Sequence, residues 1–104
     1  MHLSPEPLCI TSLNGDLESV NMAFTKLVGW PEQELRSRKL IEFVQVADRP
    51  ATEEAIRRAA TGREQVEIEH RFQGKDGEWR WLNWRLAPGG AGETWLSAAA
   101  RDVT

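Results

Sequence analysis

The sequence contains no tyrosine and a single cysteine, Cys9, among its 104 residues. One cysteine excludes an internal disulfide and any zinc site built from several cysteines, and it fits a reducing compartment. No apolar run approaches the roughly 20 residues needed to span a membrane, and the first residues lack the apolar stretch of a signal peptide. We therefore expect a cytoplasmic segment that does not insert into the membrane, whether or not its parent protein is anchored elsewhere.

The chain also lacks an excess of basic charge. Thirteen Lys and Arg residues stand against sixteen Asp and Glu residues, which leaves a formal net charge of -3. This balance gives no electrostatic reason to expect binding to nucleic acid or to an anionic membrane. With 40% hydrophobic and 28% charged residues, the composition is typical of one globular domain.

The first half of the chain predicts a β-hairpin followed by several short helices. Residues 7–13 and 17–20 form strand-like segments around a turn at Asn14-Gly15-Asp16. Asn21 can cap a helix that ends at Gly29. Further helical segments are expected at residues 31–38, 40–44 and 48–61, the last with Asp48 as its N-cap.

In the second half of the chain, apolar residues no longer recur at helical spacing but at every second position. Apolar and polar residues alternate over 66–72, 79–86 and 94–101, as they do in strands with one buried face. The segments 74–77 and 88–92 are rich in glycine and predict hairpin turns. The predicted class is therefore α+β: one antiparallel sheet with short helices packed on one face.

Five short motifs follow one another along the chain: Asn14-Gly15; Val20-Asn21 with Ala23; Gly29-Trp30 with Glu34-Leu35; Lys75-Asp76-Gly77 with Trp81; and Asp102-Val103-Thr104. In this order and spacing they resemble a PAS domain with its C-terminal PAC motif. The resemblance covers residues 7–104 as a single domain, with residues 1–6 as an N-terminal extension. We expect this domain to be excised from a longer protein.

The resemblance implies a PAS fold: a five-stranded antiparallel sheet of order 2-1-5-4-3, with helices covering one face and a small internal cavity. Such domains act as sensory or dimerisation modules in histidine kinases, cyclic-dinucleotide enzymes and transcription regulators. Two positions depart from the family pattern. Ser12 replaces the usual acidic residue before the first turn, and Val46-Ala47-Asp48 keeps only the Asp of a His-Pro-x-Asp stretch. Both lie in loops, so the fold prediction stands.

The strand alternation assigns side chains to an inner and an outer face of the sheet. The more apolar set of each late strand should point inward, toward the helices. The candidate ligand-pocket residues are Phe24, Leu27, Ile68, His70, Phe72, Leu82, Trp84 and Ala98. The first strand is ambiguous, because Leu8 and Ile10 alternate with Cys9 and Thr11, so the role of Cys9 is left open.

On the outer face the same alternation places Trp79, Trp81 and Trp95. Three exposed tryptophans would form an apolar patch that needs a cover. We therefore predict that these residues form the centre of a homodimer or interdomain contact. The alternative is packing among the chain's own long Arg and Glu side chains.

Cofactor chemistry can be weighed residue by residue. A flavin photosensor of this fold needs a cysteine in a mid-chain helix, whereas Cys9 lies in the first strand. A haem sensor usually offers a histidine from the long helix, and residues 48–61 contain none. His70 alone is a weak metal signal; the alternative is a buried histidine bonded to backbone or water. The sequence thus predicts neither flavin photochemistry nor haem, and no metal site.

The PAS resemblance implies a non-catalytic sensory domain. A small ligand or a partner contact would alter the sheet, and the change would leave through Asp102, Val103 and Thr104 to an output domain such as a histidine kinase, cyclic-dinucleotide enzyme or transcription regulator. An alternative is a ligand-free dimerisation module that uses the outer face. A third is a small α+β enzyme, which needs a pocket acid and base where the chain offers one histidine and no tyrosine.

Overall fold

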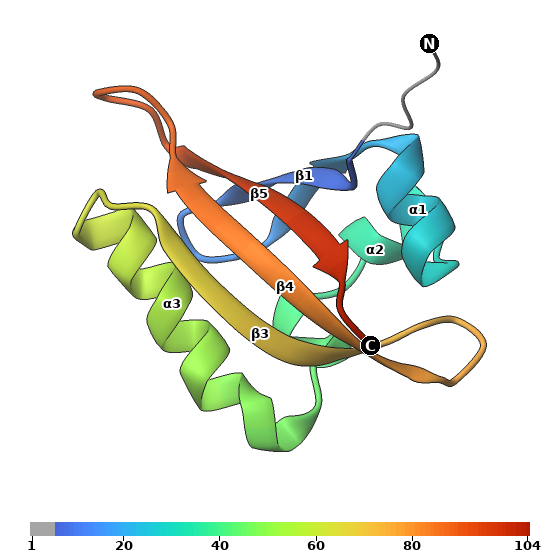
Figure 1. Cartoon of the computed structure of the whole chain (residues 1–104). Coiled ribbons are helices and arrows are strands. Elements are labelled where there is room, and N and C mark those ends of the chain that lie inside the picture. Colours follow the sequence, from blue (N-terminus) through green and yellow to red (C-terminus); the bar gives the residue numbers. More distant parts are fainter. Residues whose placement is uncertain (1–5) are drawn as a thin grey trace, which may run out of the picture.

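The computed structural model describes residues 6–104 and consists of a five-stranded antiparallel sheet with helices on one face (Figure 1). The strands are β1 (Leu8–Ser12), β2 (Leu17–Val20), β3 (Val66–Gln73), β4 (Trp79–Pro88) and β5 (Trp95–Asp102). Their order in the sheet is β2-β1-β5-β4-β3, which confirms the predicted fold and strand order. The predicted N-terminal extension lies outside the described residues, apart from Glu6.

Five helical elements connect β2 to β3. They are α1 (Met22–Val28), α2 (Glu32–Arg36), the 3₁₀ helices η1 (Leu40–Phe43) and η2 (Val46–Asp48), and α3 (Arg49–Thr61). The long helix α3 runs beside β3, and the C-terminus lies close to the hairpin between β3 and β4 (Figure 1). Among the helices of residues 6–104, none has the length and apolar character needed to cross a membrane.

The predicted cap and end of α1 are confirmed. The side-chain oxygen of Asn21 accepts hydrogen bonds from the backbone amides of Phe24 and Leu8, both at 3.0 Å. One amide side chain therefore satisfies a free donor at the helix start and also fixes the start of β1. At the other end Gly29 adopts a left-handed conformation with φ of 78°, which glycine accepts without strain.

The two departures from the family pattern were expected in loops, which is wrong: Ser12 is the last residue of β1, and Val46–Asp48 form η2. The fold accommodates both. The hydroxyl oxygen of Ser12 accepts hydrogen bonds from the amides of Asn14 and Asp16, each at 3.2 Å, and so holds the β1–β2 turn. Asp48 occupies the N-cap position of α3, but its side chain makes no capping hydrogen bond. The predicted capping role of Asp48 is therefore wrong, because its carboxylate is bound by Arg71 of β3 instead.

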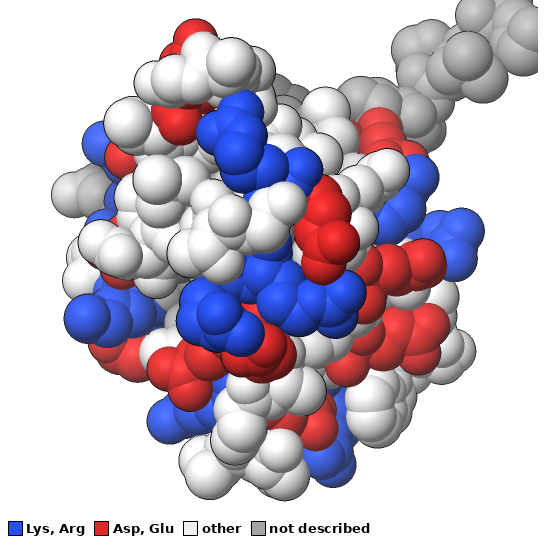
Figure 2. Space-filling view, turned by 90° about the vertical axis from the view of Figure 1, so that its left-hand side faces the viewer, with Lys and Arg blue, Asp and Glu red and all other residues white. Residues whose placement is uncertain are grey.

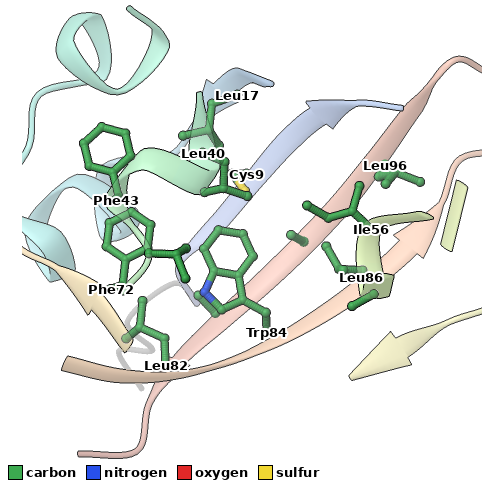
Figure 3. Close-up of a cluster of buried hydrophobic side chains, with 14 of the residues drawn as sticks. Cys9, Leu17, Leu40, Phe43, Ile56, Phe72, Leu82, Trp84, Leu86 and Leu96 are labelled. Carbon is green, nitrogen blue, oxygen red and sulfur yellow. The ribbon is translucent and has the colours of Figure 1, made fainter. Parts of the chain in front are cut away.

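The hydrophobic core lies between the inner face of the sheet and the helices (Figure 3). Trp84 occupies its middle, with Phe72 on one side and Leu86 on the other. Across the sheet Trp84 faces Ala100, and Leu86 faces Ala98. The small alanines thus leave room for the large side chains of the neighbouring strand, as close packing requires.

Candidate functional site

Four of the predicted pocket residues form a buried aromatic cluster. Phe24 of α1 lies edge-on to Phe72 and to Trp84, with ring centroids 6.1 and 5.6 Å apart. The ring of His70 lies 5.4 Å from that of Trp84. Each of these four side chains is at most 1% exposed. The alternation in β3 and β4 therefore correctly predicted that His70, Phe72 and Trp84 face the interior.

The other four predicted pocket residues belong to the same core. Leu82 and Ala98 are buried, whereas Leu27 and Ile68 are partly buried and pack against the core from its margin. Their role as a ligand pocket stays a prediction. The first strand is no longer ambiguous, since Cys9 is buried and Leu8 is exposed. Burial raises the pKa of the Cys9 thiol to about 12, so this thiol is protonated at neutral pH and a poor nucleophile.

The orientation of His70 is fixed by α3. Its Nδ1 atom lies 2.9 Å from the hydroxyl oxygen of Thr52, and that hydroxyl donates to the backbone carbonyl of Asp48 at 2.9 Å. A hydroxyl has one hydrogen, so with this donation to Asp48 we assign Nδ1–H of His70 as the donor to the Thr52 oxygen. Burial lowers the pKa of His70 to about 4, so the ring is neutral at physiological pH and Nε2 carries a free lone pair.

Two buried polar atoms of the aromatic cluster have no hydrogen-bond partner among residues 6–104. These are Nε2 of His70, an acceptor, and Nε1 of Trp84, a donor. Figure 3 shows the indole nitrogen of Trp84 on the side of the ring turned toward Leu82 and Phe72. Across residues 6–104, His, Cys, Asp and Glu side chains nowhere form a group of three placed to hold a metal ion. The cluster presents the two unpaired polar atoms among apolar side chains.

An ion pair connects the start of α3 to the outer face of the sheet. The carboxylate of Asp48 accepts from the backbone amide and Nε of Arg71, both at 2.9 Å, and from Nη2 at 3.1 Å. These hydrogen bonds from Arg71 hold the pKa of Asp48 below its usual value. The same guanidinium lies over the ring of Trp81, 5.1 Å from its centroid, at a distance typical of a cation–π contact.

The predicted signal junction is hydrogen-bonded to the backbone of Trp81. The carbonyl of Trp81 accepts from the amide of Val103 at 2.8 Å, and the amide of Trp81 donates to the hydroxyl of Thr104 at 2.9 Å. The amide of Thr104 in turn donates to the carboxylate of Asp102 at 2.9 Å. All three residues of the Asp-Val-Thr motif are thus ordered against the end of β4.

Together these contacts form a continuous chain between the interior and the junction. We call it the polar relay: His70, Thr52, Asp48, Arg71 and Trp81, ending at Val103 and Thr104. Thr52 and Arg71 were not among the predicted functional residues. The alternation in β3 and β4 places Arg71 on the outer face, opposite Trp81, so the sequence pattern could have indicated a contact between them. Nothing in the sequence pairs Thr52 with His70.

The outer-face tryptophans do not form one patch. Trp79 and Trp81 lie together on β4 and are 43% and 41% exposed. The register pairs Pro88 with Leu96, so Trp95 lies about 25 Å from Trp81 along the strand. Its indole N–H donates to Glu93 at 2.9 Å, and its ring lies so close over Gly89 that a Cβ there would be 2.9 Å away. The predicted grouping of Trp95 with the other two is therefore wrong.

Two surface hollows flank the core. One of about 470 Å³ lies between the β1–β2 turn, η1 and α3, with Gly15, Leu40 and Ile56 in its walls. The other, of about 410 Å³, lies on the outer face across β1, β4 and β5, with Leu8 and Ala99 among its lining residues.

Figure 2 shows the side on which α3 lies, where acidic and basic side chains are intermixed.

Comparisons with known proteins agree with this architecture. The family profile described as PAS fold matches residues 17–93. Similar solved structures include the PAS-B domain of Drosophila melanogaster Cycle with bound ethylene glycol, with a TM-score of 0.83 and 18% identity over 92% of this chain and 98% of that chain. No curated protein sequence matches the chain.

Two bacterial structures are also similar. The PAS domain of the Cronobacter turicensis RpfR quorum-sensing receptor, solved in complex with BDSF, gives a TM-score of 0.80 and 18% identity over 99% of this chain and 98% of that chain. A domain of a sensory box sensor histidine kinase/response regulator from Geobacter sulfurreducens gives a TM-score of 0.77 and 15% identity over 93% and 82%, respectively.

Proposed function

Because the chain belongs to the PAS fold family, we propose that it is a non-catalytic sensory domain of a cytoplasmic signalling module. A small molecule bound among the aromatic residues of the interior would shift the equilibrium between two arrangements of the sheet. The shift would pass to an output domain through Asp102, Val103 and Thr104.

The observation that carries this proposal is the polar relay. It joins a buried histidine of the interior to the residues that follow β5, without a gap between contacting groups. A contiguous network of packed and hydrogen-bonded groups can carry coupling between two sites. The similar domains add support: one belongs to a quorum-sensing receptor and was solved with BDSF, and another belongs to a sensor histidine kinase.

Ligand capture tests the proposal. The purified chain is incubated with the small-molecule fraction of a cell extract, desalted and measured by native mass spectrometry. We expect an added mass that survives desalting in the native chain and in Trp81→Ser, a control altered only on the outer face. We expect a weaker signal in Trp84→Phe, which changes the interior. A bare protein in every sample, or equal capture by Trp84→Phe, would count against an interior ligand.

A second candidate function is favoured by the outer face. Trp79, Trp81 and Leu8 are exposed apolar side chains on one side of the sheet, and Leu8 also lines the hollow of about 410 Å³. This pattern fits a surface that meets a second copy or the parent protein's next domain. Sedimentation velocity should then show a dimer that Trp81→Glu dissociates and the distant Trp95→Ser leaves intact. A monomer at all concentrations would contradict self-association.

A further inference from the structure

The interior contains an unmatched donor and an unmatched acceptor on neighbouring rings. Nε2 of His70 and Nε1 of Trp84 have no partner among the described residues, although both side chains are only 1% exposed. Their ring centroids are 5.4 Å apart. Unpaired polar atoms in an apolar interior are unfavourable, so a core that retains two of them on adjacent rings points to a partner group.

The roles of the two atoms are fixed by their surroundings. Trp84 can only donate through its indole N–H. We assign the Nδ1 hydrogen of His70 to the bond with Thr52, because the Thr52 hydroxyl donates its own hydrogen to the carbonyl of Asp48. Nε2 is therefore an acceptor. A complementary group must donate one hydrogen bond and accept another.

We propose that the interior binds an apolar molecule bearing one neutral hydroxyl group, which donates to Nε2 of His70 and accepts from Nε1–H of Trp84. This inference rests on the proposed ligand-sensing function. The two atoms should also discriminate between ligand classes. A ketone can only accept and leaves His70 unpaired, a carboxylate cannot donate, and an ammonium group cannot accept.

The surroundings of the pair suit the apolar body of such a molecule. Phe24, Phe72 and Leu82 are fully buried beside it. Phe24 is carried by the seven-residue helix α1 and touches Phe72 and Trp84 only by ring edges. In the proposal, this short helix moves to make room for the ligand next to the unpaired atoms while the sheet is retained.

The test compares cyclohexanol with cyclohexanone, which have nearly the same shape and differ in hydrogen-bond donation. Both are titrated into ¹⁵N-labelled protein, and NMR follows the Trp84 indole N–H and the His70 ring nitrogens. We expect cyclohexanol to shift both signals and to bind about tenfold or more tightly than cyclohexanone, because only the alcohol satisfies both atoms. The Trp84 signal is assigned from its loss in Trp84→Phe.

Two variants check the histidine. In His70→Phe the alcohol and the ketone should bind equally, because the acceptor is gone. In Thr52→Val the group that fixes Nδ1–H is lost, so Nε2 can carry the hydrogen and the preference for the alcohol should fall. The second variant keeps the histidine and decides the matter if His70→Phe does not fold.

Three results would overturn the inference. They are equal affinity for both probes in the native chain, shifts confined to Trp79 and Trp81, and no shift at all. Equal interior binding of both probes would remove the hydroxyl assignment and leave the sensory function intact. The function itself is judged separately, by ligand capture from the extract.

Discussion

The carboxylate of Asp48 accepts three hydrogen bonds from Arg71, one from the backbone amide and two from the guanidinium. This pair fixes the start of α3 to β3 across 23 residues of chain. Asp48 also presents its backbone carbonyl to Thr52, which orients His70. One residue therefore joins the interior histidine to the outer face of the sheet, which makes Asp48 the centre of the polar relay.

Replacing Asp48 with Asn should lower the free energy of unfolding by about 1 kcal/mol, because charge-assisted hydrogen bonds to Arg71 become neutral ones while the pair remains partly screened by water. Urea denaturation measures the change. The matched control is Glu54→Gln, which breaks an exposed pair with Arg57 and should have no measurable effect. Equal stability of both variants and the native chain would contradict a structural role for Asp48.

Stability should depend on pH through His70. Its pKa is lowered from 6.5 to about 4 by burial, so between these values the unfolded chain binds a proton that the folded chain does not. The free energy of unfolding should therefore fall as the pH drops from 6.5 to 4, by up to about 3 kcal/mol. Urea titrations at several pH values test this, and the slope over that window should largely disappear in His70→Phe. An unchanged slope in that variant would assign the pH dependence to other groups.

Asn21→Ala should destabilise the chain by about 1–2 kcal/mol, since the side chain both caps α1 and binds the amide of Leu8. Asn21→Asp keeps the accepting oxygen but loses the donor to the carbonyl of Glu6, so it should recover part of the loss. Thermal unfolding followed by circular dichroism distinguishes the two variants. If Asp is no better than Ala, the accepting oxygen does not account for the effect.

Arg71→Met should loosen the signal junction. The substitution keeps an apolar stem near Trp81 but removes the charge that lies over its ring and the hydrogen bonds to Asp48. Exchange of the Val103 amide with solvent should become several-fold faster, because Val103 donates to the carbonyl of Trp81. Arg85→Met, which removes an exposed pair with Glu6 on the same face, serves as the control. Equal rates in the two variants would exclude Arg71 from the relay.

Local patterns were sufficient to predict much of this structure. Period-two alternation put Trp84 inside and Trp81 outside, and the cap at Asn21 and the stop at Gly29 follow from backbone chemistry within one helix. Asp48 shows where local rules end. Its position predicts a cap, but a long-range partner, Arg71, competes successfully for the same carboxylate.

The remaining differences also come from distance in space. Alternation assigns Trp95 to the correct face of the sheet but does not determine which residue of β4 lies opposite it. The register between β4 and β5 places Trp95 far from Trp81. The bond between Thr52 and His70 requires α3 to lie against β3 at one particular rotation. Propensity and spacing within each segment carry no information about that rotation.

The central claim is that a molecule in the interior changes the junction after β5, and hydrogen exchange at the Val103 amide tests it most directly. The rate is measured by NMR in the free chain and in the chain saturated with the molecule captured from the extract. The account predicts a several-fold change in exchange rate that is lost in Arg71→Met while binding persists. An identical Val103 rate in the free and saturated native chain would contradict it.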